Sequence, residues 1–282
     1  MRMTEQIQLG FALVFAVAAW GTMLRTRPLP PRRRWVVTAL AGVAALVFAA
    51  LHAVRTQLSA DHYAVLLDVV TIALFLVPYW QTGQFFTAPN EKIQSRLLAI
   101  DQRLLPHASA TSGTGRGIVG LVLEMAYLSC YPLVPMGLIA VYAAGLRDKV
   151  EGFWLVLLVA TYLCYAVTPL VPAYPPRSLL AGEIGTAKLT HEDAANKGRL
   201  LNRLILKHGS IHAISFPSAH VASAFAIALV LLYYAPLLGL VFLAIAVMIS
   251  LGAVIGRYHY ALDVILGAVT ALAVFLVCLR LL

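Results

Sequence analysis

The sequence predicts an all-α protein, a polytopic membrane helix bundle of about eight transmembrane helices, and two observations carry this prediction. Of the 282 residues, 61% are hydrophobic and only 12% are charged, whereas a soluble domain carries about 25% charged residues. The apolar residues also gather in long runs, and a spanning helix needs about 20 mostly apolar residues. Eight such runs occur, at residues 7–24, 35–54, 63–80, 118–145, 152–172, 215–235, 237–256 and 259–281.

The connections between these runs predict three further features. The fourth run contains Pro132 and Pro135, which predict a kinked helix. Before it, apolar and charged residues alternate at helical spacing over residues 90–106, a pattern typical of an amphipathic helix at the membrane interface. The connection at 173–213 is too long for a simple turn, and loops of this length are usually functional or disordered.

The distribution of charge favours a membrane role over nucleic-acid binding. The net charge is +9, but the basic residues cluster between apolar runs, where they set orientation and contact anionic lipid headgroups. Five arginines lie in residues 25–34, so the positive-inside rule places this loop in the cytoplasm. The three cysteines, Cys130, Cys164 and Cys278, lie in apolar runs and are interpreted as small core residues.

Ionisable residues inside membrane spans are costly and are therefore candidates for function. For Asp68 and Glu124 we expect structural pairing, with each other or with hydroxyl groups across the bundle. His259 and Asp263 are four positions apart, so a helix would place them on one face. The carboxylate can then accept the proton of one ring nitrogen and make the other nitrogen a better nucleophile. A satisfied buried pair without catalytic function explains the same spacing.

The segment SFPSAH adds an anion-binding feature. Ser215 is a good N-cap and Pro217 suits a first helical turn, so the helix is predicted to begin there with free N–H groups that favour an anion. His220 then lies in the first turn, where an imidazolium can donate a proton. Alternation of the spans brings His220, His259 and two arginines, Arg177 and Arg257, to one membrane face. The sequence therefore predicts an anion site with a nucleophile and an acid.

Two motifs in these segments resemble those of the type 2 phosphatidic acid phosphatase (PAP2) superfamily. FPSAH resembles its P-S-x-H motif, and RYHYALDVILG is similar to its third motif, which ends H-x-x-x-D-x-x-x-G. The resemblance implies a six-helix catalytic membrane domain over residues 63–282, with residues 1–62 as an N-terminal two-helix addition. The R-Y-H-Y form resembles the branch that contains inositolphosphotransferases and inositol phosphorylceramide synthases.

The resemblance also implies roles for individual residues. His259 matches the nucleophile that forms a phosphohistidine, Asp263 its orienting carboxylate, and His220 the acid that protonates the leaving oxygen. The implied phosphate-binding residues are Arg177, Ser218 and Arg257.

The sequence departs from the phosphatase pattern at two positions. Leu170 stands where the first motif has a lysine, and Ala253 stands where the third motif has an arginine, which Arg257 replaces in part. These departures leave water and an alcohol open as the acceptor.

The expected function is that of an integral membrane lipid-phosphate phosphatase acting on a phospholipid or polyprenyl phosphate. The alternatives are a phosphotransferase that moves a phosphoalcohol such as phosphoinositol between lipids, and an anion or lipid transporter. We expect no metal and no cofactor; the partners are a membrane lipid substrate and anionic headgroups, and not nucleic acid. The protein is expected in a bacterial cell membrane. The charge rule places the site on the cytoplasmic face, whereas the resemblance implies the extracytoplasmic face.

Overall fold

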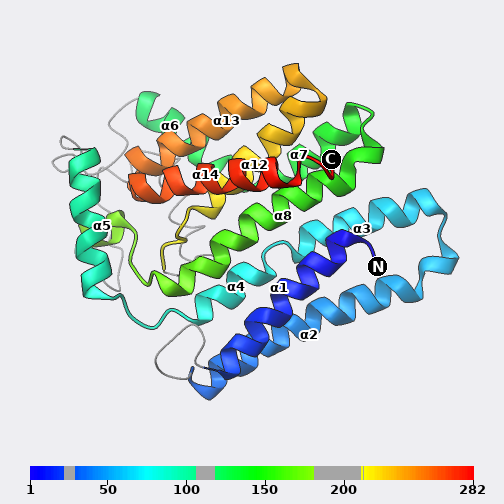
Figure 1. Cartoon of the computed structure of the whole chain (residues 1–282), viewed down its shortest axis with the longest axis horizontal. Helices are drawn as coiled ribbons and strands as arrows, with labels where there is room; N and C mark the ends of the chain where they lie inside the picture. The colour runs from blue at the N-terminus through cyan, green and yellow to red at the C-terminus, as the bar shows by residue number, and fades with distance from the viewer. Residues whose placement is uncertain (22–28, 106–117, 181–210, 212) are drawn as a thin grey trace.

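The computed structural model describes residues 1–21, 29–105, 118–180, 211 and 213–282, and these residues form helices and connecting segments without a strand (Figure 1). Residues 181–210 and 212 of the long connection expected at 173–213 lie outside the described residues. The α-helices are α1 (Met3–Trp20), α2 (Pro31–Ala53), α3 (Ala60–Leu74), α4 (Val77–Gln84), α5 (Glu91–Leu104), α6 (Ile118–Leu128), α7 (Leu133–Ala143), α8 (Val150–Val167), α9 (Pro176–Leu180), α12 (Ala219–Tyr234), α13 (Pro236–Ile255) and α14 (Ala261–Cys278).

The prediction of an all-α polytopic membrane bundle is confirmed. Six helical segments of the described chain are long and apolar enough to cross a membrane: α1, α2, α3 with α4, α8, α13 and α14. The predicted fourth span is broken into α6 and α7, which meet at 72°. The predicted kink is therefore present, and it lies between residues 128 and 133, next to Pro132. The sixth predicted span is α12, an apolar helix of only 16 residues.

Helix α12 lies at the centre of the packing and contacts α7, α8, α13 and α14. Its buried side chains include the small residues Ala222, Ala224, Ala226 and Ala228, which allow neighbouring helices to approach closely. Because α12 is surrounded on several sides, the residues at its first turn are held by a rigid core.

The N-terminal helices are joined to α8 by buried amide side chains. The Nε2 of Gln8 on α1 donates to the Thr71 carbonyl at 2.9 Å and to the Tyr162 hydroxyl of α8 at 3.2 Å. The Nε2 of Gln81 on α4 donates to carbonyls of α1 and α2, each at 3.0 Å. Such interhelical hydrogen bonds contribute to association between membrane helices. They attach α1–α4 to the rest of the bundle; the predicted boundary at residue 62 stays a prediction.

Asp68 has a structural environment, as the sequence predicted. Its carboxylate accepts hydrogen bonds from the Tyr142 hydroxyl at 2.5 Å and from Nε1 of Trp154 at 2.9 Å. Glu124 likewise accepts from a hydroxyl, that of Tyr258 at 2.6 Å. Pairing with hydroxyl groups is therefore the alternative that the structure shows.

The predicted amphipathic helix is α5, which lies across one end of the bundle (Figure 1). Its buried face contains Gln94, Leu97 and Asp101 and packs against the protein, while charged residues such as Arg96 and Arg103 are exposed. The apolar face of α5 thus covers this end of the bundle. Its location at a membrane interface stays a prediction.

Candidate active site

The predicted His–Asp pair is formed where α14 begins. The Nδ1 of His259 lies 3.2 Å from Oδ2 of Asp263, and both side chains are buried. His259 belongs to the connection that follows α13, whereas Asp263 lies in the first turn of α14. Because Asp263 accepts the proton of Nδ1, the ring nitrogen left for chemistry is Nε2.

The second histidine lies beside the first, although the two are 39 positions apart in the sequence. His220 is in the first turn of α12, and its ring centroid is 5.8 Å from that of His259, with the rings nearly perpendicular at 80°. Tyr127 and Tyr131 pack edge-on against His220, each with a centroid separation of 5.9 Å. The tyrosines of α6 and the α6–α7 break therefore orient this ring toward His259.

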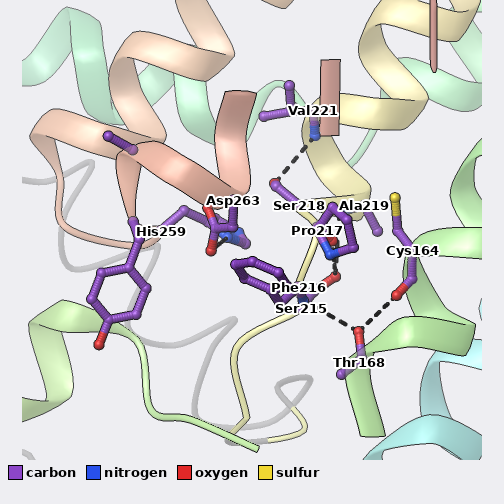
Figure 2. A network of polar contacts seen from close by, with 12 residues as sticks. Cys164, Thr168, Ser215, Phe216, Pro217, Ser218, Ala219, Val221, His259 and Asp263 are labelled. Carbon is purple, nitrogen blue, oxygen red and sulfur yellow. Dashed lines mark hydrogen bonds and ion pairs between the residues drawn. The ribbon is translucent and has the colours of Figure 1, made fainter. Parts of the chain in front are cut away.

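The start of α12 differs from the prediction. The helix begins at Ala219 and its N-cap is Ser218, whose side chain accepts from the N–H of Val221 at 3.4 Å. Ser215 is not the N-cap, and Pro217 precedes the helix instead of lying in its first turn. The reason is that the ring of Pro217 clashes with helical backbone geometry at the preceding residue, Phe216, so the helix begins after the proline. Ser215 nevertheless bonds the helix start, because its Oγ accepts from the N–H of Ala219 at 3.2 Å (Figure 2).

These bonds change the expected role of the backbone N–H groups at this helix start. The N–H groups of Ala219 and Val221 are bonded to the two serines, and the N–H of Ser218 donates to the Asp263 carbonyl at 3.0 Å. They are therefore already satisfied within the protein. The buried Ser218 joins α12 to α14 in this structure, and its role in binding phosphate stays a prediction.

Arg177 is brought to the same cluster as predicted. Its backbone N–H donates to the Arg257 carbonyl at 2.9 Å, and its guanidinium lies 4.8 Å from the centroid of the Tyr258 ring. Its Nη1 is 3.9 Å from Oε1 of Glu124. Tyr258 in turn stacks on Tyr127 with 4.2 Å between centroids. Tyr258 and Glu124 thus hold the Arg177 guanidinium, and the Tyr127 ring that stacks on Tyr258 also packs against His220 and His259. The Arg177 side chain is 21% exposed.

Arg257 lies at the cluster, but its charge is already paired. The Nη1 of Arg257 is 2.6 Å from Oδ2 of Asp101 on α5, and both side chains are buried. The role of Arg257 in binding phosphate stays a prediction. Asp101 was not among the predicted site residues; the signal for it was an acidic residue on the same face of the amphipathic helix as Leu97.

Leu170 and Ala253, the two residues that depart from the phosphatase pattern, belong to the helical framework around the site. Leu170 lies in a short 3-10 helix, Thr168–Leu170, and is half-exposed. Ala253 is fully buried, and its carbonyl accepts from the N–H groups of Tyr258 and His259 at 2.9 and 3.1 Å. The site therefore brings together a paired imidazole, a second imidazole and two arginines, which is a suitable set for transfer of an anionic group.

Comparison with known protein families gives a match over most of the chain. The family model described as the PAP2 superfamily matches residues 95–277, from within α5 to the last turn of α14. All the residues of the cluster lie inside this region, and α1–α4 precede it. Comparisons with curated proteins and with solved structures gave no match.

Proposed function

The chain belongs to the PAP2 superfamily, and on that premise we propose that it is an integral membrane lipid-phosphate phosphatase that works through a phosphohistidine intermediate. Membership indicates an enzyme of the phosphatase or phosphotransferase type. The observation that supports the finer proposal is the contact between His220 and His259, whose rings are 5.8 Å apart while Asp263 holds Nδ1 of His259.

In the first step, Nε2 of His259 attacks the phosphorus atom of a lipid phosphate monoester. A P–N bond forms as the P–O ester bond breaks, and His220 donates a proton to the departing lipid alkoxide, so that a neutral alcohol leaves. General acid catalysis of this kind contributes about 10²–10⁴-fold. The guanidinium of Arg177 is the group we assign to the equatorial phosphoryl oxygens, whose charge it would stabilise during transfer.

In the second step, a water molecule attacks phosphorus and the P–N bond breaks. His220, now neutral, accepts a proton from the water, and inorganic phosphate leaves. An alcohol in place of water would give a new phosphomonoester, and a phosphodiester would form only if the lipid substrate were itself a phosphodiester whose phosphoalcohol is transferred to His259. The absence of cationic residues at Leu170 and Ala253, where the phosphatase pattern has them, supports a phosphotransferase as the second candidate.

The test uses protein purified in detergent with a long-chain lipid phosphate as the only added lipid. We expect release of inorganic phosphate, no turnover by His259→Asn, and a fall in kcat of about 10²–10⁴-fold for His220→Asn. With an aryl phosphate, whose phenolate leaves without a proton, the His220→Asn enzyme should lose much less activity. His62→Asn is the matched control, since His62 is exposed at the start of α3, at the end away from α5 (Figure 1).

Three results would contradict the proposal. Phosphate release by His259→Asn at the wild-type rate excludes His259 as the nucleophile. Strict dependence on a second lipid supports the phosphotransferase instead. Near-wild-type function of His259→Ala in cells would favour transport over both catalytic candidates.

A further inference from the structure

The segment between α13 and α14, which contains His259, is hydrogen-bonded to a carboxylate of a different helix, α5. Asp101 on α5 accepts from Nη1 of Arg257 at 2.6 Å through Oδ2, and from the N–H of Ala261 at 2.9 Å through Oδ1. These two donors lie two positions before and two positions after His259. The two carboxylate oxygens of Asp101 thus bind the segment on both sides of His259, the proposed nucleophile.

The backbone at Arg257 needs such support. Its φ is +61°, in the left-handed region that a non-glycine residue rarely adopts and that persists only where the surroundings enforce it. Its N–H donates to the Val254 carbonyl at 3.1 Å, and its carbonyl accepts the N–H of Arg177 at 2.9 Å. The ion pair with Asp101 therefore fixes a residue that joins the His259 and Arg177 segments.

A second side chain of α5 contacts the same segment. Gln94 donates through Nε2 to the Tyr260 hydroxyl and accepts through Oε1 from the N–H of Tyr174 at 2.8 Å. Gln94 and Asp101 are seven positions apart, so they lie on the same face of α5 about two turns apart. Helix α5 is thereby attached to both chain segments of the site.

We propose that Asp101 is a positioning residue for His259, and that Arg257 serves as its buried partner instead of binding phosphate. This inference rests on the proposed function. A displacement of about 1 Å in a reacting group can cost about 10²-fold in rate. Loss of either partner leaves a buried charge without its counterion, which strongly destabilises the local structure.

The charges at the site support this assignment. A substrate phosphate would have to compete for Arg257 with a carboxylate that already lies 2.6 Å from its Nη1. The side chain of Arg177 is more exposed than that of Arg257, at 21% against 8%. Arg177 is thus the arginine placed for substrate.

A double-mutant cycle tests the proposal on the full-length protein in detergent, with Asp101→Leu, Arg257→Met and the double variant. We expect each single change to lower kcat by about 10²-fold, with KM and the inhibition constant of vanadate within about threefold of wild type. In the double variant no charge is left unpaired, so kcat should recover to within about tenfold of wild type. The matched controls are Gln102→Leu and Arg103→Met, exposed residues of α5 that should leave kcat unchanged.

Amide hydrogen exchange over residues 257–261 gives a readout that needs no substrate. Amide exchange should be faster in both single variants than in the wild-type protein, and in the double variant it should return toward the wild-type rate. If Asp101→Leu does not fold, Asp101→Asn keeps the side-chain shape and an acceptor oxygen, and should show a smaller fall in kcat at unchanged KM.

Two outcomes overturn the inference. If the fall in kcat of the double variant equals the product of the two single falls, Asp101 and Arg257 do not act as a unit. A tenfold or larger rise in KM and in the vanadate constant for Arg257→Met alone would make Arg257 a phosphate ligand. Failure of the proposed function is a separate result, in which the wild-type protein releases no phosphate while the exchange pattern of the cycle is unchanged.

Discussion

At the scale of single residues, Gly267 shows how closely the two motifs are packed. It is the last residue of the H-x-x-x-D-x-x-x-G pattern. A Cβ atom at this position would lie 2.5 Å from the carbonyl oxygen of Ser218, a backbone atom that is fixed because the Ser218 N–H is bonded to Asp263. The glycine is required by the approach of α14 to the start of α12.

We therefore expect Gly267→Ala to separate the two histidines and to lower both the thermal midpoint in detergent and kcat. The added methyl group meets backbone, so the strain cannot be relieved by a side-chain rotation. The control is Gly10→Ala, since a Cβ on Gly10 has no atom within 4 Å. That change should leave kcat unchanged and stabilise α1 by about 0.5–1 kcal/mol. Equal effects of the two substitutions on kcat would refute the close-approach argument.

The residues of the site differ in how far the sequence could predict them. The pairing of His259 with Asp263 follows from a four-residue spacing, and the position of His220 follows from a helix start marked by serine and proline. The contact of Asp101 with Arg257 joins residues 156 positions apart, and no local pattern connects them. The helix start itself was placed three residues too early, because either serine is a suitable N-cap and the bond from Ser218 to α14 depends on tertiary structure.

At the scale of elements, α5 is the helix that connects the surface of the molecule with the site. Its N-cap is Asn90, whose side chain accepts from the N–H groups of Lys92 and Ile93 at 3.1 and 3.2 Å. The Asn90 N–H also donates to the Pro172 carbonyl at 2.8 Å, which ties the start of α5 to the chain that follows α8.

We expect Asn90→Ala to destabilise the first turn of α5 by about 1 kcal/mol, since the two N–H groups lose their acceptor. Because α5 carries Gln94 one turn later, faster amide exchange should extend through residues 92–94 and kcat should fall by less than it does in Asp101→Leu. Asn90→Ser, which restores an N-cap acceptor, should return both quantities toward wild type. A fall in kcat that the serine variant does not restore would place the effect elsewhere.

Sequence patterns predicted the elements better than their contacts. Apolar runs of spanning length are determined by the bilayer, and they located α1–α4, α8, α13 and α14. The prolines predicted the break between α6 and α7. What the apolar face of α5 contacts could not be predicted in this way, because the sequence pattern suits contact with lipid and contact with protein equally. The packing of Leu97 with Ala173, Ile214 and Tyr260 shows that this face contacts protein.

At the scale of the whole molecule, the start of α2 and the catalytic cluster lie at the same end of the bundle. Arg33 donates to the Phe86 carbonyl just before α5, and α5 carries Asp101 (Figure 1). The connection between α12 and α13, at Ala235 and Pro236, lies at the other end. This agrees with the alternation of spans deduced from the sequence. A single labelling experiment can therefore determine which end of the bundle is cytoplasmic.

From the positive-inside rule we expect Pro236→Cys to react with a membrane-impermeant thiol reagent in intact cells, and Pro30→Cys to react only after permeabilisation. Both positions are exposed. The native thiols of Cys130, Cys164 and Cys278 are buried and give little background. The reverse labelling would place the site on the extracytoplasmic face, as the family resemblance implies.

The buried hydrogen bond between Trp154 and Asp68 also gives the protein an internal optical reporter. Trp154 is fully buried, whereas the other three tryptophans, Trp20, Trp35 and Trp80, are 42–62% exposed. In bilayers that contain brominated lipid, we expect the fluorescence of the exposed indoles to be quenched and that of Trp154 to persist. A variant that keeps only Trp154 would therefore report the integrity of the helix core, separately from any assay of turnover. Strong quenching of that variant would mean that lipid reaches the centre of the bundle.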